Sequence, residues 1–239
     1  TVKRKLASLK ALFNYYDFEH DDFLNPFRKL RIRFKEPYVL PTVMTCNEVK
    51  EILKYLYKLR ADNPDTGGYA YKAQTRDIAV VELLFATGIR VSELCELSCD
   101  AVDLKQATIK VFGKGSKERV IQICSVEVLK ILRQYQRLFA PSKCFFINRL
   151  GNRLSSQSVR LLIKRCREEI GIGKKITPHT FRHTFATLLL EEDVDIKYIQ
   201  NLLGHSSITT TQIYTHVNMN KQKKILSSKH PRKKMEMEE

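Results

Sequence analysis

Residues 76–94 read RDIAVVELLFATGIRVSEL and carry the clearest structural signal in the chain. Their apolar pattern predicts a buried helix from Arg76 to Thr87, and Gly88 is a typical residue at the C-terminal end of a helix. Ser92 can cap a second helix that starts just beyond the turn. Arg90 is therefore expected on a turn between two buried helices, where a guanidinium can project into a cleft. The alternative for Arg90 is a purely structural ion pair.

The same periodicity predicts helices on both sides of this stretch. They are expected over residues 2–18, 45–58, 125–139, 158–170, 177–192, 196–203 and 218–227. Two alternating runs, 107–112 and 118–123, flank the sequence Gly-Lys-Gly-Ser-Lys and predict a β-hairpin. The expected fold class is mainly α (α+β), a helical bundle with a small β-sheet or hairpin.

The charge composition indicates the kind of partner but not the reaction. The 239 residues include 42 Lys and Arg but 26 Asp and Glu, which gives a formal net charge of +16. Such an excess favours an acidic polymer as partner, with nucleic acid ahead of anionic lipid. No apolar run approaches the roughly 20 residues that span a bilayer, so no membrane partner is expected. The six cysteines form no CxxC pair, which favours reduced thiols in a cytoplasmic protein. With nucleic acid as the expected partner, the protein is expected to be nucleoid-associated.

Proline and charge mark the expected domain boundaries. Three prolines lie in a basic, irregular stretch, so residues 25–41 are predicted to be an interdomain linker. Residues 1–24 then look like the last helix of another domain, and residues 42–217 form the main domain. Residues 218–239 are expected to be a C-terminal helix and tail.

The sequence Thr-Pro-His-Thr-Phe-Arg-His at 177–183 is the first candidate for chemistry. His179 and Arg182 share one face of a predicted helix near its N-terminus, where anions are favoured, and arginine can bind phosphate through two nitrogens. The alternative is a surface arginine beside a capping histidine. A zinc site at His179 and His183 is a weaker alternative, because no third ligand is evident.

Further candidates lie in the hairpin and near the C-terminus. Lys114 lies at the hairpin tip between two glycines, and Lys117 and Arg119 extend the positive charge. The alternative is a solvated basic turn. His205 follows a helix-ending glycine, and Tyr214 lies in a Thr-rich segment, where a tyrosine is more often a packing residue than a nucleophile.

Taken together, these residues resemble the tyrosine recombinase (phage integrase) family. The matching positions, in order, are Arg90, Lys114, His179, Arg182, His205 and Tyr214. Their surroundings are similar as well: Thr-Gly-Ile-Arg-Val-Ser-Glu-Leu, the Gly-Lys-Gly hairpin, Pro-His-Thr-Phe-Arg-His, Leu-Gly-His-Ser-Ser and Tyr-Thr-His. The resemblance covers roughly residues 40–217 and is closest to the Xer and transposon-integrase branch. It implies the catalytic fold of the family, with residues 1–24 as the last helix of a core-binding domain in a longer recombinase or a natural short form.

The resemblance also implies a reaction. Tyr214 would attack a DNA phosphodiester to form a 3′-phosphotyrosyl bond, while Arg90 and Arg182 neutralise the charge of the transition state. His205 would add a hydrogen bond, His179 would accept the proton of the tyrosine, and Lys114 would protonate the leaving 5′-oxygen. No metal ion, ATP or other cofactor is needed for such a reaction.

Supporting roles follow for other residues. Glu93 is expected to orient Arg90, His183 to pack near the site, and Lys117 and Arg119 to contact DNA. The expected partner is double-stranded DNA with a specific recombination site. The protein would act as a homo-tetramer on DNA, with a monomer possible in solution, and the C-terminal helix would pack on a neighbouring subunit.

Two other functions remain open at this point. A type IB topoisomerase uses similar chemistry as a monomer, and a DNA-binding accessory protein would carry a vestigial site. The motif wording and the presence of all six residues favour the recombinase.

Overall fold

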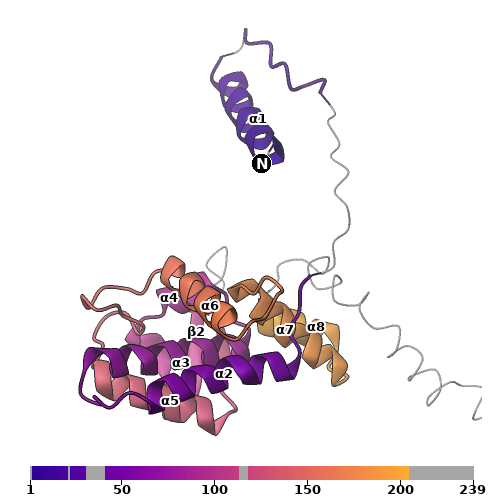
Figure 1. Cartoon of the computed structure of the whole chain (residues 1–239). Helices are drawn as coiled ribbons and strands as arrows, with labels where there is room; N and C mark the ends of the chain where they lie inside the picture. The colour runs from indigo at the N-terminus through magenta and orange to yellow at the C-terminus, as the bar shows by residue number, and fades with distance from the viewer. Residues whose placement is uncertain (1, 21, 31–40, 113–117, 205–239) are drawn as a thin grey trace, which may run out of the picture. The chain divides into compact units, whose positions relative to one another are not determined.

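The structure is a computed structural model that describes residues 2–20, 22–30, 41–112 and 118–204. The chain divides into two compact units, one over residues 1–39 and the other over residues 40–239 (Figure 1). Each unit is described by itself.

In residues 2–20 and 22–30, the first unit shows one helix and the turn that follows it. Helix α1 (Val2–Glu19) confirms the helix predicted over residues 2–18. The ring of Phe13 lies 6.0 Å from that of Phe23 and 5.2 Å from that of Phe27, measured between centroids. The buried Asn25 donates a hydrogen bond of 3.0 Å to the side chain of Asn14. The segment after α1 therefore folds back onto the helix.

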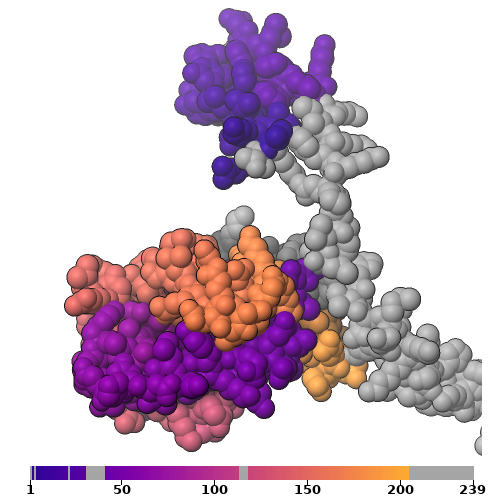
Figure 2. Space-filling view, viewed as in Figure 1, coloured from indigo at the N-terminus to yellow at the C-terminus, as the bar shows by residue number. Residues whose placement is uncertain are grey.

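The second unit is built mainly from helices. Helices α2 (Cys46–Ala61), α3 (Tyr69–Thr87) and α5 (Val126–Phe139) lie side by side (Figure 1). Helix α6 (Ser156–Glu169) packs against α2 and α3, and its orange surface borders the purple surface of the N-terminal helices of this unit in Figure 2. The remaining helices are α4 (Val91–Glu96), α7 (Pro178–Glu191) and α8 (Ile196–Leu203). None of the described helices is both long and apolar enough to cross a membrane.

Capping residues set most helix ends. The backbone nitrogen of Thr45 donates to the Glu48 carboxylate at 2.7 Å, and the Thr45 hydroxyl accepts from the Glu48 nitrogen at 3.2 Å. These bonds form the capping box that a threonine followed three residues later by a glutamate predicts. Three predicted starts were wrong. Helix α6 begins at Ser156 rather than Ser158, because Ser155 is its cap. Helix α3 begins at Tyr69, seven residues before the predicted start at Arg76, directly after a glycine pair. Helix α4 begins at Val91 because the Glu93 carboxylate, rather than the Ser92 hydroxyl, caps its first turn at the Arg90 nitrogen.

A small antiparallel sheet completes the unit. Strands β2 (Thr108–Phe112) and β3 (Glu118–Gln122) form the predicted hairpin, and the short strand β1 (Val102–Asp103), which was not predicted, pairs with β2 after a 3₁₀ turn, η1 (Cys99–Ala101). Ile109 pairs with Ile121, and both are buried. The sheet therefore packs one face on the core. The mainly α fold with a small β element is confirmed.

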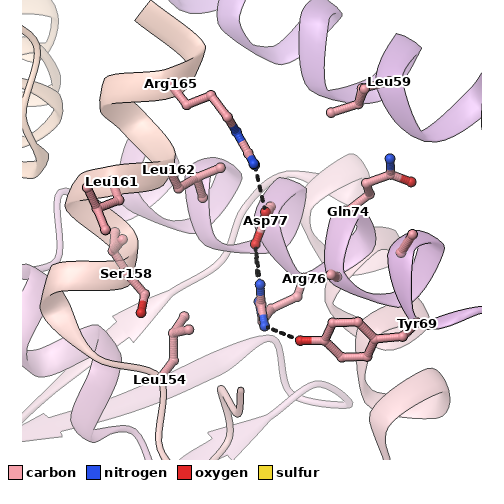
Figure 3. A pocket seen from close by; sticks show the side chains of 13 residues that line it. Leu59, Tyr69, Gln74, Arg76, Asp77, Leu154, Ser158, Leu161, Leu162 and Arg165 are labelled. Atoms are coloured by element: carbon pink, nitrogen blue, oxygen red, sulfur yellow. Dashed lines mark hydrogen bonds and ion pairs between the residues drawn. The ribbon is translucent and has the colours of Figure 1, made fainter. Parts of the chain in front are cut away.

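A cavity of about 650 Å³ lies between α3 and α6 (Figure 3). Asp77 on its wall accepts two hydrogen bonds from Arg76 and lies 3.6 Å from Arg165 of α6. The second guanidinium arm of Arg76 contacts the Tyr69 hydroxyl and the Ile147 carbonyl, each at 3.3 Å. Because these polar groups bind one another, they join α3 to α6. None of the predicted site residues that the structure describes lines this cavity.

Candidate active site

The turn at residues 88–90 places the first arginine. Gly88 has a φ of +59°, and a Cβ there would lie 2.7 Å from the Phe185 ring and 2.8 Å from the Leu203 side chain. Glycine is thus required both by conformation and by the close approach of α7 and α8. The side chain of Arg90, which ends this turn, is 30% exposed.

Glu93 holds Arg90 in place. Its carboxylate accepts one hydrogen bond from Arg90 Nη1 at 2.7 Å and one from the Arg90 backbone nitrogen at 2.9 Å. The side chain of Glu93 is 5% exposed, and burial opposes its ionisation. Hydrogen bonds from Arg119 and Arg90 outweigh that effect and lower the pKa of Glu93 to about 2. The expected contact between Glu93 and Arg90 is therefore present, with a carboxylate that stays charged.

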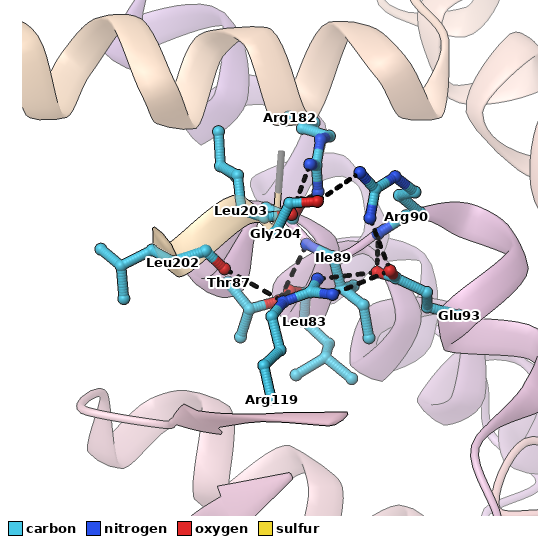
Figure 4. Close-up of polar contacts among 11 residues, drawn as sticks. Leu83, Thr87, Ile89, Arg90, Glu93, Arg119, Arg182, Leu202, Leu203 and Gly204 are labelled. Atoms are coloured by element: carbon cyan, nitrogen blue, oxygen red, sulfur yellow. Dashed lines mark hydrogen bonds and ion pairs between the residues drawn. The ribbon is translucent and has the colours of Figure 1, made fainter. Parts of the chain in front are cut away.

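The second arginine, Arg182, comes from the second turn of α7. It is 4% exposed, and its Nη1 and Nη2 atoms donate to the carbonyls of Gly88 and Leu203 at 2.7 and 2.6 Å. Arg90 Nη2 donates to the neighbouring Gly204 carbonyl at 2.9 Å. The two guanidiniums that the sequence predicted to act together thus meet at the end of α8 (Figure 4).

The end of α8 accounts for this meeting. The last carbonyl groups of a helix lack partners within the helix and carry partial negative charge. Here three arginines satisfy three of them: Arg119 Nε binds the Leu202 carbonyl at 3.2 Å, Arg182 binds Leu203, and Arg90 binds Gly204. Neutral carbonyls position the guanidiniums without cancelling their charge.

His179 lies at the N-terminal end of α7, two residues after the cap Thr177. It is exposed, and beside it a cavity of about 200 Å³ is lined by Lys175, His183 and the cap. Partial burial and then the positive charges of Arg182, Arg160 and Arg90 lower the pKa of His179. A histidine of this kind stays neutral at lower pH and can accept a proton. Burial and the neighbouring His179 also lower the pKa of His183.

Arg119 lies in an unexpected place. We predicted a DNA contact, but its Nη1 and Nη2 atoms bind the two carboxylate oxygens of Glu93 at 2.9 and 2.8 Å, and its side chain is 14% exposed. The period of a strand was the missed signal, because Arg119 stands on the same strand face as the buried Ile121. Four other predicted site residues lie outside the described residues: Lys114, Lys117, His205 and Tyr214.

No cluster of three or more His, Cys, Asp or Glu side chains suited to a metal ion is present in the described part of the chain. What the described residues bring together is positive charge. Arg90 and Arg119 bind a single carboxylate, Glu93, and Arg182 binds the carbonyls of Gly88 and Leu203 beside them. Such a cluster suits the binding of a phosphate group.

The helical fold and the paired guanidiniums have the form that a phosphoryl-transfer enzyme requires. The model of the Phage integrase family matches residues 42–221. The chain belongs to this family, the tyrosine recombinases, and is a site-specific DNA recombinase that breaks and rejoins strands.

Individual relatives agree with this assignment. A tyrosine recombinase of Agathobacter rectalis is 49% identical over 98% of this chain and 77% of its own length. The crystal structure of XerA recombinase matches with a TM-score of 0.65 and 32% identity, over 81% of this chain and 67% of the other. XerH bound to its difH substrate before cleavage matches with a TM-score of 0.73 and 25% identity, over 95% of this chain and 65% of the other.

Proposed function

We propose that this recombinase cuts and rejoins DNA through a covalent bond between Tyr214 and a 3′-phosphate. The observation that carries the proposal is the meeting of Arg90 and Arg182 at the carbonyls of residues 88, 203 and 204. Two guanidiniums held in this way form a ready receptor for one phosphodiester.

The arginines supply the electrostatic part of catalysis. When a nucleophile attacks a phosphodiester, negative charge grows on the non-bridging oxygens of the pentacoordinate transition state. Arg90 and Arg182 stay charged at any physiological pH and can each bind two oxygens. His205, the residue after Gly204, donates a further hydrogen bond to the same oxygens.

Proton transfers complete the step. The phenolic oxygen of Tyr214 forms a bond to phosphorus as the bond from phosphorus to the 5′-oxygen breaks, and His179 takes the phenolic proton. Lys114 gives a proton to the leaving 5′-oxygen. The lowered pKa of His179 supports its part, because the neutral ring is the form that accepts. Rejoining is the reverse reaction with a 5′-hydroxyl from the other strand.

The covalent intermediate explains why no energy source is required. The phosphotyrosyl bond replaces the phosphodiester that was broken, so the free energy of that bond is kept for rejoining. Charge neutralisation by two arginines takes the part that a divalent cation plays in many nucleases.

The rest of the basic surface serves binding and assembly. We propose that double-stranded DNA with a recombination site is the substrate, held by phosphate contacts that include Lys117. The active form is a homo-tetramer on two sites, with residues 218–239 packing on a neighbouring subunit. Residues 1–24 act as the last helix of a core-binding domain, residues 25–41 as a linker and residues 42–217 as the catalytic domain. The protein works in the cytoplasm, on nucleoid DNA.

A nicked DNA substrate tests the nucleophile. The nick lets the short fragment diffuse away after cleavage, so the protein–DNA adduct accumulates and survives detergent. The wild type is expected to form the adduct and Tyr214→Phe to form none. Tyr198→Phe is the matched control, because Tyr198 is an exposed tyrosine on α8. An adduct of normal yield with Tyr214→Phe would show that another residue attacks.

Two further measurements test the need for a metal ion and distinguish a recombinase from a topoisomerase. EDTA is expected to leave adduct formation unchanged, and a loss would require a metal ion. Exchange between two marked duplexes is expected for a recombinase, whereas relaxation of supercoils without exchange would identify a topoisomerase.

A further inference from the structure

The guanidinium of Arg119 is fully engaged inside the protein. Two of its nitrogens bind Glu93, and the third binds the Leu202 carbonyl at the end of α8. The side chain joins three segments that are distant in sequence: strand β3, the turn of α4 and the last turn of α8 (Figure 4).

Glu93 is shared between Arg119 and Arg90. Each arginine donates one hydrogen bond to Oε1 and one to Oε2, so four hydrogen bonds converge on one carboxylate. Removal of Arg119 would leave the Glu93 carboxylate bound by Arg90 alone. Because a buried carboxylate is unstable unless its charge is paired, Glu93 would then shift or take up a proton. The orientation of Arg90 therefore depends on a residue that does not touch it.

Gly204 shows how closely Arg119 approaches the other side of the site. A Cβ at Gly204 would lie 2.9 Å from Arg119 Nη1 and 3.1 Å from its central carbon. Gly204 also supplies the carbonyl that holds Arg90 Nη2. Arg119 thus contacts both groups that bind Arg90: the Glu93 carboxylate and the turn at Gly204.

We propose that Arg119 is a positioning residue of the recombination reaction, which orients Arg90 through Glu93 and fixes the end of α8, and that it is not a DNA contact. This inference rests on the proposed role of Arg90 as a phosphate ligand. It replaces our prediction from the sequence that Arg119 binds DNA.

Adduct formation on nicked DNA at saturating protein measures the positioning role. Arg119→Gln is expected to slow the reaction about 100-fold, the size of effect that a small misplacement of a catalytic group produces. Arg119→Lys, which keeps the charge but cannot bind both oxygens in the same geometry, is expected to lie between Arg119→Gln and the wild type. Affinity for DNA and its dependence on salt are expected to stay the same. Arg137→Gln, the loss of one exposed charge on α5, is the matched control.

A DNA contact would behave differently. Loss of a phosphate contact weakens binding and lowers the slope of log affinity against log salt by about one. That result for Arg119→Gln, or a normal cleavage rate, overturns the proposal. Tyr214→Phe is assayed beside it: if that variant still forms the adduct, the proposed function fails, whereas a normal Arg119→Gln beside an inactive Tyr214→Phe refutes only the positioning role.

The pH profile separates positioning from a general loss of structure. Among the described residues, the charged groups that face Glu93 are Arg90 from its own turn, Arg119 from β3, and Glu96 and Lys110 across a small cavity. Without Arg119, Glu93 takes up a proton at a higher pH, so the cleavage rate of Arg119→Gln relative to wild type is expected to fall as pH falls. A constant ratio would indicate a merely structural defect.

A double-mutant cycle completes the test. If Arg119 acts through Glu93, then Arg119→Gln is expected to cost little more in a Glu93→Gln background, and the pH dependence of the ratio disappears. Additive losses would contradict action through Glu93. The melting temperature of each variant is measured as well. A value above the assay temperature shows that a slow reaction is not caused by unfolding.

Discussion

The carbonyl oxygen of Gly204 accepts a hydrogen bond of 2.9 Å from Arg90 Nη2, although the two residues are 114 positions apart. Gly204 has a φ of +63°, a left-handed conformation that turns this carbonyl toward the guanidinium. The turn after α8 is therefore part of the site that orients Arg90.

Gly204→Ala is expected to damage both stability and cleavage. The left-handed conformation costs a side chain about 1–2 kcal/mol, and the new Cβ would also press on Arg119. Gly171→Ala is the control, since Gly171 has a φ of +72° but nothing within 4 Å of a Cβ. Urea unfolding should show a larger loss for Gly204→Ala, and adduct formation should slow for that variant alone. Equal losses with normal cleavage would contradict the contact.

Glu93 should make folding depend on pH. Its pKa in the folded protein is about 2, below the ordinary value of 4.5. It therefore contributes stability that is present above pH 4.5 and is lost as the pH falls toward 2. The contribution is about 3 kcal/mol, from the shift in pKa.

Urea unfolding across this pH range checks that contribution. Glu93→Gln is expected to be less stable than wild type at neutral pH, and the two curves should converge in acid. Glu51→Gln, which changes a carboxylate that is 46% exposed, should follow the wild type. Parallel curves for Glu93→Gln and wild type would show that the carboxylate is not held as described.

Arg160 is expected to tune His179. Burial is the main cause of the lowered pKa of His179, and the charges of Arg182, Arg160 and Arg90 add to it. Arg160→Gln should therefore raise the pKa of His179 while leaving it below the ordinary value of 6.5. An NMR titration of the histidine ring in free protein measures this shift. Lys164→Gln, another exposed position on α6, should leave the titration unchanged, and an equal shift in that variant would argue against a specific effect of Arg160.

Tyr57→Phe tests a polar pair in the core. The Tyr57 hydroxyl donates a hydrogen bond of 3.0 Å to Glu82, which is 8% exposed and whose pKa burial raises. Removal of the hydroxyl should lower the free energy of unfolding by about 1–3 kcal/mol at neutral pH. The deficit should shrink in acid, because protonated Glu82 no longer needs the donor. Tyr55→Phe on the same helix is the control, and a deficit that is independent of pH would point to packing instead.

Local patterns predicted the fold well where one residue decides the geometry. Gly88 ends α3, Thr45 and Glu48 form a capping box, and Gly204 ends α8, all as expected from the sequence. The start of α3 was wrong because residues 69–75 carry no strong apolar period. The short strand β1 was missed because two residues give too little alternation to detect.

The sequence named several residues that meet in the site but did not predict the hydrogen bonds that hold them. Arg90, Glu93 and Arg182 stand in recognisable motifs, yet the two arginines donate to backbone carbonyls of residues 88, 203 and 204. Because every residue carries a backbone carbonyl, the sequence does not indicate which carbonyls will accept these hydrogen bonds. The contacts of Arg119 with Glu93 and Leu202 were not predicted, because the prediction rested on its charge and its place beside a basic loop rather than on its strand face.

The use of α8 as the acceptor for three arginines has a consequence for timing. Ribosomes add about 5–20 residues per second, and a domain tends to fold as its segments emerge. Arg90, Arg119 and Arg182 all leave the ribosome before the carbonyls of residues 202–204 that hold them. A nascent chain can therefore be drawn to DNA by its charge before its cutting site exists. Synthesis of the last turn of α8 is the step that brings the three guanidiniums together.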